Sequence, residues 1–311
     1  MVTRDAAGHP QRWITGLASL VASLSVLAAG TGILTGWGHV HRAFVTLRGE
    51  TVSIQGGGLY GHESVSVAAQ AIGQDFVTLL VAVPLLVVAA RMASRGSVRW
   101  LLLRTGALGY FAYTYLLMAF GGTYNELFLV YVALFSASSF GFILSIVSID
   151  PSRLQGEFGP RFARRPVGWS LVGFGALLAL LWLGRIVPSL LLGKTPPGLE
   201  SDTTLFVQAG DLGIIIPTAV LTGILLIRGR ALGHLLAAVM LVNASTFGLA
   251  LLAMAASMTI SGVVVAPIEM VFFSAITIVF LVATAHTLTS VRAHPGPRAP
   301  SALRPDPATQ G

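Results

Sequence analysis

Four carboxylates and one arginine lie inside or beside long apolar segments of this chain. Asp75 and Asp211 follow glycines at the start of two apolar runs, and Glu126 and Glu269 stand near the start of two others. Arg185 lies inside a fifth run. Ionisable residues at membrane depth cost roughly 2.5–3.5 kcal/mol on insertion scales and usually face a cavity or a partner. If these carboxylates converge, they form a negative vestibule that binds cations or protons, with Arg185 as counterion.

The same residues also have structural interpretations. Asp75 and Asp211 could cap helix N-termini, where a carboxylate accepts from free N–H groups and meets the positive end of the helix dipole. Asn125 could cap the helix that Glu126 opens. Tyr124 suits the aromatic belt at the membrane interface. Beside these interpretations, Asn125 and Tyr124 are candidates for binding the ligand or ion together with the four carboxylates and Arg185.

Glu269 and Arg185 leave similar alternatives open. Pro267 could start a helix and place Glu269 in its first turn. Arg185 could extend its guanidinium to the headgroups instead of pairing with a carboxylate.

Histidines supply a weaker metal hypothesis. His39, His41 and His62 share one polar segment, and such side chains could bind zinc, but their spacing matches no recognised signature. The chain has no cysteine, which excludes thiolate nucleophiles, iron–sulfur ligation and cysteine-based zinc sites. No P-loop, G-x-S-x-G or H-E-x-x-H motif occurs. We therefore expect no cofactor and do not expect a catalytic residue set.

The elements that position these residues are transmembrane helices. Hydrophobic residues make up 54% of the chain and charged residues only 10%, against about 25% charged in soluble domains. A helix needs roughly 20 apolar residues to cross the hydrocarbon core. The apolar runs predict an all-α membrane protein with eight spans, over residues 13–37, 75–93, 101–121, 126–149, 167–192, 211–227, 233–257 and 264–288.

The first run could be mistaken for a secretory signal, because basic residues precede it and small residues follow. Its apolar length exceeds the roughly 7–15 residues of a signal core. We interpret it as an uncleaved span.

Basic residues sort to one side of the predicted membrane. With the N-terminus placed in the cytoplasm, fifteen of the nineteen basic residues fall inside, and only Arg42, Arg48, Arg185 and Lys194 fall outside. This bias follows the positive-inside rule and favours both termini in the cytoplasm. It also explains the net charge of +7 without nucleic-acid binding. Eight of the twelve acidic residues fall on or near the outer side, and the positive-inside rule does not account for them.

The polar residues and prolines that interrupt the eight apolar runs recur in the same order, which indicates two parallel four-helix repeats. Pro84 and Pro217 interrupt the second and sixth runs. By their order in each half, Asp75 corresponds to Asp211 and Glu126 corresponds to Glu269. Chance similarity between two apolar halves remains the alternative. The predicted organisation is a first half at 1–149 with an outer loop at 38–74, a basic linker at 150–166, a second half at 167–291 and a disordered tail at 292–311. Alternation at 44–48 and 51–55 predicts a β-hairpin in the outer loop.

Several segments carry a resemblance. The stretches Gly73–Leu79 with Pro84, Leu108–Tyr115 and Tyr124–Tyr131, and Asp211-Leu212-Gly213 with Pro217, resemble an uncharacterised group of bacterial multi-pass membrane proteins. The resemblance covers about half of the chain. It implies a membrane location and supplies no function.

These observations lead to one functional hypothesis and two alternatives. We expect a multi-pass protein of the bacterial inner membrane that binds or translocates a small solute or cation through an outer acidic site. The first alternative is a non-catalytic partner or sensor that acts through the 38–74 loop. The second is an intramembrane enzyme on lipid or quinone, for which no nucleophile motif exists. The bilayer is the one partner that the sequence indicates, and the oligomeric state stays open.

Overall fold

The computed structural model describes residues 4–292. The described chain is a bundle of long helices with one small hairpin. Its helical elements are α1 (Arg4–Thr35), α2 (Val65–Val77), η1 (Thr78–Ala82), α3 (Val83–Ala93), α4 (Val98–Phe120), α5 (Phe128–Val147), α6 (Pro151–Glu157), α7 (Arg164–Leu192), α8 (Phe206–Gly210), η2 (Asp211–Ile215), α9 (Ile216–Ile227), α10 (Ala231–Ile260) and α11 (Pro267–Ser290). Strands β1 (Arg42–Val45) and β2 (Thr51–Ile54) pair antiparallel, with Arg42 opposite Ile54.

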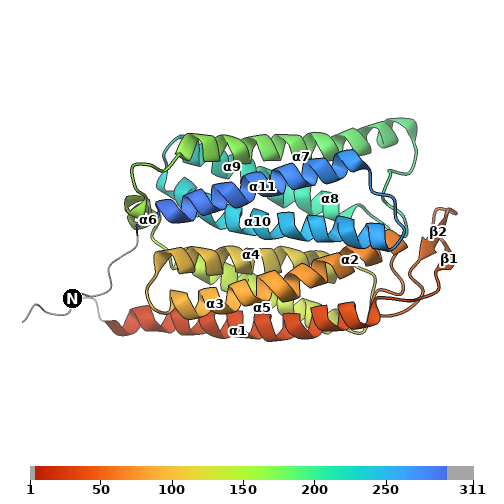
Figure 1. Cartoon of the computed structure of the whole chain (residues 1–311), viewed down its shortest axis with the longest axis horizontal. Helices are drawn as coiled ribbons and strands as arrows, with labels where there is room; N and C mark the ends of the chain where they lie inside the picture. Colours follow the sequence, from red (N-terminus) through yellow and green to blue (C-terminus); the bar gives the residue numbers. More distant parts are fainter. Residues whose placement is uncertain (1–3, 293–311) are drawn as a thin grey trace, which may run out of the picture.

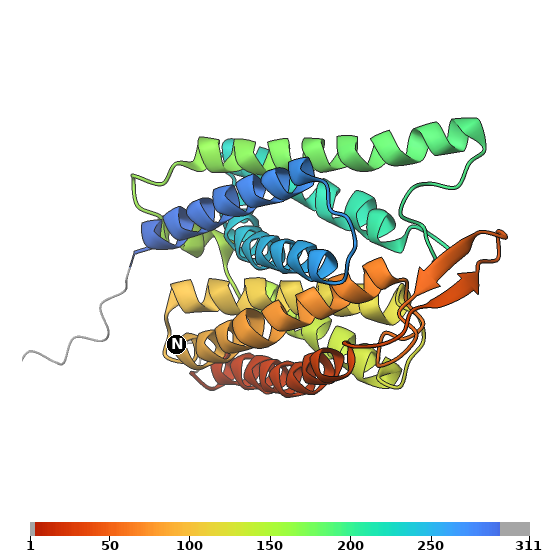
Figure 2. The same cartoon turned by 45° about the vertical axis from the view of Figure 1, so that its right-hand side comes forward.

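The helices lie roughly parallel in two layers (Figure 1). One layer holds α1 to α5 and the other holds α7 to α11, and the turned view separates the same two groups (Figure 2). We call the end with α6 and the turns α3–α4 and α9–α10 the basic end, and the end with β1 and β2 the hairpin end. Helix α1 starts and α11 finishes at the basic end, so the described chain enters and leaves the bundle on the same side.

Seven helical segments among the described residues are long and apolar enough to cross a membrane. They are α1 from Gln11, the continuous segment Val65–Ala93, α5, α7, the continuous segment Phe206–Ile227, α10 and α11. Many large apolar side chains on their outer faces are exposed, including Leu180 of α7 and Val282 of α11. Exposed Trp13 and Trp169 lie near the basic end, as in an interfacial aromatic belt. The chain is therefore an all-α, multi-pass membrane protein.

Helix α4 is less apolar than these seven segments, and its surroundings explain the difference. Twelve of its 23 residues are buried, among them Arg104, Tyr110 and Tyr113. By contrast, α11 buries only Thr277, Phe280 and Thr287. A helix that faces protein on most sides does not need the uniformly apolar surface of a lipid-facing helix.

Two of the long helical segments each contain an irregular turn. A π-helical turn, η1 or η2, joins α2 to α3 and α8 to α9, and a proline follows it at the second residue of α3 and of α9. Proline has no N–H and disturbs the regular ladder, so such turns commonly lie beside it. Corresponding features of the two halves are 133 residues apart: the π turns start at 78 and 211, the prolines are 84 and 217, the left-handed glycines are 96 and 229, and the next helices start at 98 and 231.

The two layers meet where α2 and α4 pack on α10. A Cβ atom at Gly106 would lie 2.5 Å from the Cβ atom of Val242 and 2.8 Å from the carbonyl oxygen of Val239. The absence of a side chain at Gly106 therefore permits a close backbone approach, as at small-residue helix contacts in membranes.

Several sequence expectations need correction. The second predicted span starts at Val65 rather than at residue 75, because Ser64 caps α2 by accepting from the Val67 N–H. The predicted hairpin is confirmed, although β1 starts at Arg42 and the connecting turn covers 46–50. The linker 150–166 contains the short helix α6, which Asp150 caps. Beyond Arg292, the predicted tail lies outside the described residues.

Candidate functional site

Asp75 lies inside α2 and not at its N-terminus, so the capping interpretation is wrong for this residue. It is ten residues, or about 15 Å, beyond the first residue of the helix. Its side chain is buried, with 6% exposed, and accepts a hydrogen bond from the hydroxyl of Tyr60 at 2.6 Å. Gly32 of α1 makes room for this pair, because a Cβ atom there would lie 1.9 Å from Asp75 Oδ2 and 2.8 Å from the Tyr60 hydroxyl.

Tyr60 supplies the proton in this hydrogen bond. It precedes α2, outside the membrane-crossing segment, and is 3% exposed. Burial, followed by the negative charge of Asp75, raises the pKa of Tyr60 well above its usual value. The phenol therefore remains protonated and donates to the carboxylate.

Buried polar side chains continue from Asp75 along the contact of α2 and η1 with α4. Gln74 Nε2 donates to the Thr114 hydroxyl at 2.8 Å, and the hydroxyls of Thr78 and Tyr110 lie 2.8 Å apart. Thr78 is the first residue of η1. These two hydrogen bonds lead from the Asp75 turn into the π turn, where the regular helix ladder is interrupted.

Tyrosines of α4 and α5 complete the surroundings of Asp75. The rings of Tyr115 and Tyr131 stack with their centroids 6.0 Å apart, and both are buried. The Tyr131 hydroxyl lies beside the side chains of Asn125 and Tyr60, and the buried hydroxyl of Ser25 on α1 lies beside Tyr115.

Asp211 occupies a second, separate position at the start of η2. Its helix begins five residues earlier at Phe206 and continues to Ile227, so Asp211 does not cap it either. The Tyr113 hydroxyl of α4 donates to Asp211 Oδ1, and Trp182 Nε1 of α7 donates to Oδ2 at 2.9 Å. The side chain is half-buried. Both aspartates therefore accept a tyrosine hydroxyl, one in each layer of the bundle.

Arg185 pairs with one of the predicted carboxylates. Its Nη2 lies 3.0 Å from Glu269 Oε1 of α11, and both side chains are about two-fifths exposed. The guanidinium also lies over the Trp182 ring, 5.5 Å from its centroid. Through Trp182, the Arg185–Glu269 pair adjoins Asp211 and forms one polar cluster across α4, η2, α7 and α11.

Glu126 and Tyr124 lie apart from both clusters, whereas the Asn125 side chain lies beside the Tyr131 hydroxyl at the edge of the Asp75 surroundings. Glu126 is exposed in the turn before α5. Asn125 Oδ1 accepts from the Leu127 N–H at 3.0 Å, while α5 itself has no side-chain cap. Tyr124 is exposed and packs on Phe128, with ring centroids 5.6 Å apart. We leave Glu126 and Tyr124 out of the proposed site.

An acidic layer covers the hairpin end above Asp75. Glu63 is 5% exposed, and its Oε1 accepts from the Thr123 N–H at 2.6 Å. Burial raises the pKa of Glu63 above its usual value. Burial also raises the pKa of Asp202 to about 7, with smaller contributions from the negative charges of Glu63 and Glu200.

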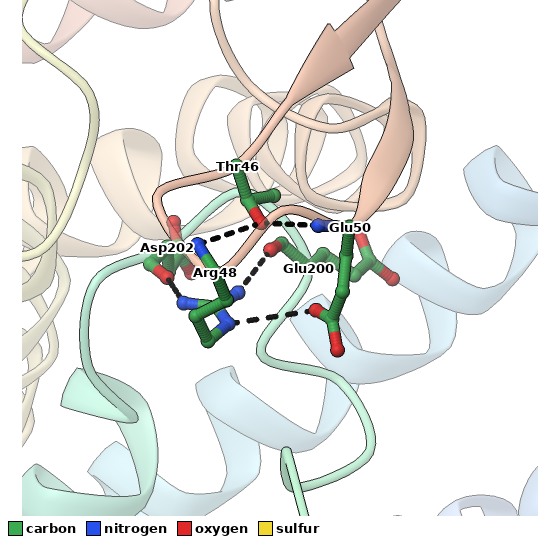
Figure 3. A network of polar contacts seen from close by, with 5 residues as sticks. All are labelled: Thr46, Arg48, Glu50, Glu200 and Asp202. Atoms are coloured by element: carbon green, nitrogen blue, oxygen red, sulfur yellow. Dashed lines mark hydrogen bonds and ion pairs between the residues drawn. The ribbon is translucent and has the colours of Figure 1, made fainter.

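Arg48 holds the hairpin turn against the second layer (Figure 3). Its Nη1 donates to the carbonyl oxygen of Asp202 at 3.0 Å, and its Nη2 to that of Glu200 at 2.7 Å. Its Nε lies 3.5 Å from Glu50 Oε2. The Thr46 hydroxyl accepts from the N–H groups of Arg48 and Glu50 and fixes the turn that presents the guanidinium.

The histidines do not form a metal centre in the part of the chain that the structure describes, since no group of three His, Asp or Glu side chains is close enough to hold an ion. His39 and His41 line a cavity of about 220 Å³ at the hairpin end, and His62 is not among its lining residues. A ring nitrogen of His39 lies 2.6 Å from the Thr35 carbonyl oxygen at the end of α1.

Sequence reasoning missed the partners of both aspartates. Tyr60 precedes α2 and Trp182 lies in an apolar run, so neither position carries a sequence signal for contact with a carboxylate. Comparisons of the chain with protein-family models, with curated proteins and with solved structures return no match.

Proposed function

We propose that this membrane protein binds and translocates a small cation, a proton included, and that Asp75 is the centre of its site. The burial of Asp75 carries the proposal. No Lys or Arg pairs with Asp75 among the described residues, and Tyr60 is its hydrogen-bond donor. A carboxylate buried without a basic partner is stable when it holds a proton or a cation.

The path inward from Asp75 supports translocation in addition to binding. Gln74, Thr78, Tyr110 and Thr114 offer hydroxyl and amide oxygens along one helix contact, and such polar groups can coordinate a cation on its way inward. Irregular backbone at membrane depth is tolerated where it is buried in protein or lines a cavity, and η1 lies on this path.

The proposal includes a topology. Helix α4 is the eighth span, the basic end faces the cytoplasm, and the membrane is the inner membrane of a bacterium. The acidic hairpin end then faces outward, and Asp75 is reached from there. The excess of arginine at the basic end supports this orientation.

We further propose that the two layers are parallel repeats, with a register set by the shared spacing of 133 residues. Gly106 of α4 then corresponds to Val239 of α10, and these two residues meet at the contact between the layers. In this register the equivalent of Asp75 in the second repeat is Gln208, and the equivalent of Asp211 in the first repeat is Thr78. The register replaces the expected equivalence of Asp75 with Asp211, so we assign the proposed cation to Asp75.

Reconstitution of the purified full-length protein into liposomes tests the proposal. A potassium diffusion potential, negative inside, drives cations inward, and entrapped pH-sensitive and sodium-sensitive dyes report which cation enters. We expect uptake by the wild type, at least a tenfold slower rate for Asp75→Asn, and an unchanged rate for Glu126→Gln, which removes an exposed carboxylate at the same end. Equal rates for wild type and Asp75→Asn would reject the proposal.

The hairpin favours a second candidate, a partner or sensor protein that acts through the 38–74 loop. All four residues of β1 are exposed, including Phe44 and Val45, and Leu47 in the turn is 92% exposed. Replacement of residues 42–54 by a short Gly/Ser linker distinguishes the two candidates. If the protein is a partner or sensor, this replacement abolishes its signalling, and neutralisation of Asp75 leaves signalling intact. If it is a cation translocator, the replacement leaves cation uptake unchanged.

A further inference from the structure

A cavity opens at the basic end of the first layer, between α1 and the turn that joins α3 to α4. Its volume is about 610 Å³. Its polar lining comes from Gln11, Arg12, Thr15, Ser94 and Ser97, and no carboxylate is among its lining residues in the described part of the chain. The cavity is therefore basic and lies at the opposite end of the bundle from Asp75.

The N-terminus of α4 forms one wall of this cavity. Ser97 occupies the N-cap position, but its side chain makes no capping hydrogen bond. The first N–H groups of a helix have no partner within the helix and carry the positive end of its dipole. The start of a 23-residue helix is therefore an anion-binding element that this chain leaves uncapped.

Arg104 is an independent indication of an anion. It lies one turn deeper than Leu101, a lining residue on the same helix, and is fully buried. Its Nη1 donates to Oε1 of Gln11 at 3.0 Å, so the guanidinium lies behind a lining residue of the cavity without lining it. Among the described residues, its Nε and Nη2 have no hydrogen-bond partner, and none of the ion pairs includes Arg104. A buried guanidinium that is not paired is strongly unfavourable.

We propose that this cavity binds a phosphate group, carried either by a phospholipid headgroup or by a soluble phosphate. Guanidinium groups match the oxygens of phosphate in a bidentate geometry, and helix N-termini bind the same group through backbone N–H. Basic pockets between transmembrane helices on the cytoplasmic side are typical sites for anionic headgroups. Arg12, Ser97 and the first turn of α4 contact the phosphate, and the charge of Arg104 lies directly behind Gln11.

The experiment measures the midpoint of thermal unfolding of the purified full-length protein in detergent. One arm adds inorganic phosphate, with sodium chloride at matched ionic strength as control. The other adds phosphatidylglycerol, with a glucosyl diacylglycerol, which has no phosphate, as control. Stabilisation by phosphate in the absence of lipid assigns a soluble ligand, and stabilisation by phosphatidylglycerol alone assigns a headgroup.

Three variants locate the effect. Arg12→Gln, at an exposed lining residue, should raise the apparent Kd about fivefold. Arg104→Met should raise it at least tenfold, and Arg165→Gln, an exposed arginine at the basic end of α7, should change it less than twofold.

The unliganded variants separate binding from a structural role. Because methionine removes a buried unpaired charge, unliganded Arg104→Met should unfold at or above the wild-type temperature. A purely structural Arg104 predicts the reverse, a lower temperature with and without phosphate. If Arg104→Met does not fold, the exposed Arg12→Gln variant carries the test alone. The proposal is overturned if neither source of phosphate stabilises the wild type, or if phosphate stabilises the wild type and Arg12→Gln equally.

Discussion

Gly32 is the position where one added methyl group tests the Asp75–Tyr60 pair most sharply. In Gly32→Ala, the new Cβ atom would lie 1.9 Å from Asp75 Oδ2 and 2.8 Å from the Tyr60 hydroxyl. Real Cβ atoms do not approach other heavy atoms this closely, so either α1 moves away from α2 or the carboxylate leaves the tyrosine.

The expected magnitude has three parts. Overpacking a buried site costs about 1–3 kcal/mol. Loss of a hydrogen bond to a charged group costs about 1.5–3 kcal/mol. Alanine is favoured over glycine in a helix by about 0.5–1 kcal/mol, which offsets part of this loss. If α1 shifts and the hydrogen bond is also lost, the three contributions together lower the free energy of unfolding by about 1.5–5.5 kcal/mol.

Gly30→Ala is the matched control, because it lies on the same helix and has no atom within 4 Å of its added Cβ. It should be neutral or stabilising by up to about 1 kcal/mol. The assay is reversible denaturant unfolding in detergent micelles, followed by tryptophan fluorescence. If Gly32→Ala is as stable as Gly30→Ala, the packing of Asp75 and Tyr60 against α1 is wrong.

Three further predictions concern the remaining polar contacts. Tyr113→Phe removes a donor to Asp211 and should lower the free energy of unfolding by about 1.5–3 kcal/mol, and a neutral result would exclude that hydrogen bond. A double-mutant cycle of Arg185→Gln with Glu269→Gln should give a coupling energy of about 0.2–1 kcal/mol, because both side chains are about two-fifths exposed; a value well above this range would show that the pair is desolvated. Asp202 has a pKa raised to about 7 from its ordinary 3.8, so its contribution to docking of the hairpin is fully present below about pH 4 and is lost as the pH rises through about 7. Hydrogen exchange of the hairpin should accordingly quicken between pH 5 and 8 more than base catalysis predicts, and Asp202→Asn should remove this excess.

Hydropathy predicted the bundle from the sequence because lipid-facing helices need apolar side chains along their whole length. It located α7 and α11, which bury few residues. It was less accurate for α2, where Gln70 and Gln74 interrupt the apolar pattern. Those amides have partners inside the protein, with Gln74 bonded to Thr114. The predicted start at residue 75 then made Asp75 resemble a helix cap, although it lies in the third turn of the helix.

The candidate site was less predictable because its contacts join residues far apart in the sequence. Arg185 was expected to pair with a carboxylate, yet nothing in the sequence selected Glu269 over the other three. The 133-residue spacing could be read from the prolines at 84 and 217. The π turns have the same spacing, but only the backbone geometry of the structure reveals them. Arg104 resembled the other basic residues of its end, and its burial depends on tertiary packing that the sequence does not show.

Infrared difference spectroscopy of cation binding tests the role of Asp75 most directly. The purified protein is exchanged between a cation-free buffer and buffers that contain sodium, potassium or lithium, at a pH near 6. If a cation replaces a proton on Asp75, the band of a protonated carboxyl group should disappear and carboxylate bands should grow. The change should be absent in Asp75→Asn and retained in Glu126→Gln. If sodium, potassium and lithium all leave the carboxyl band of the wild type unchanged, the proposed cation is the proton alone. A carboxyl band that responds to a cation identically in wild type and Asp75→Asn would contradict the account.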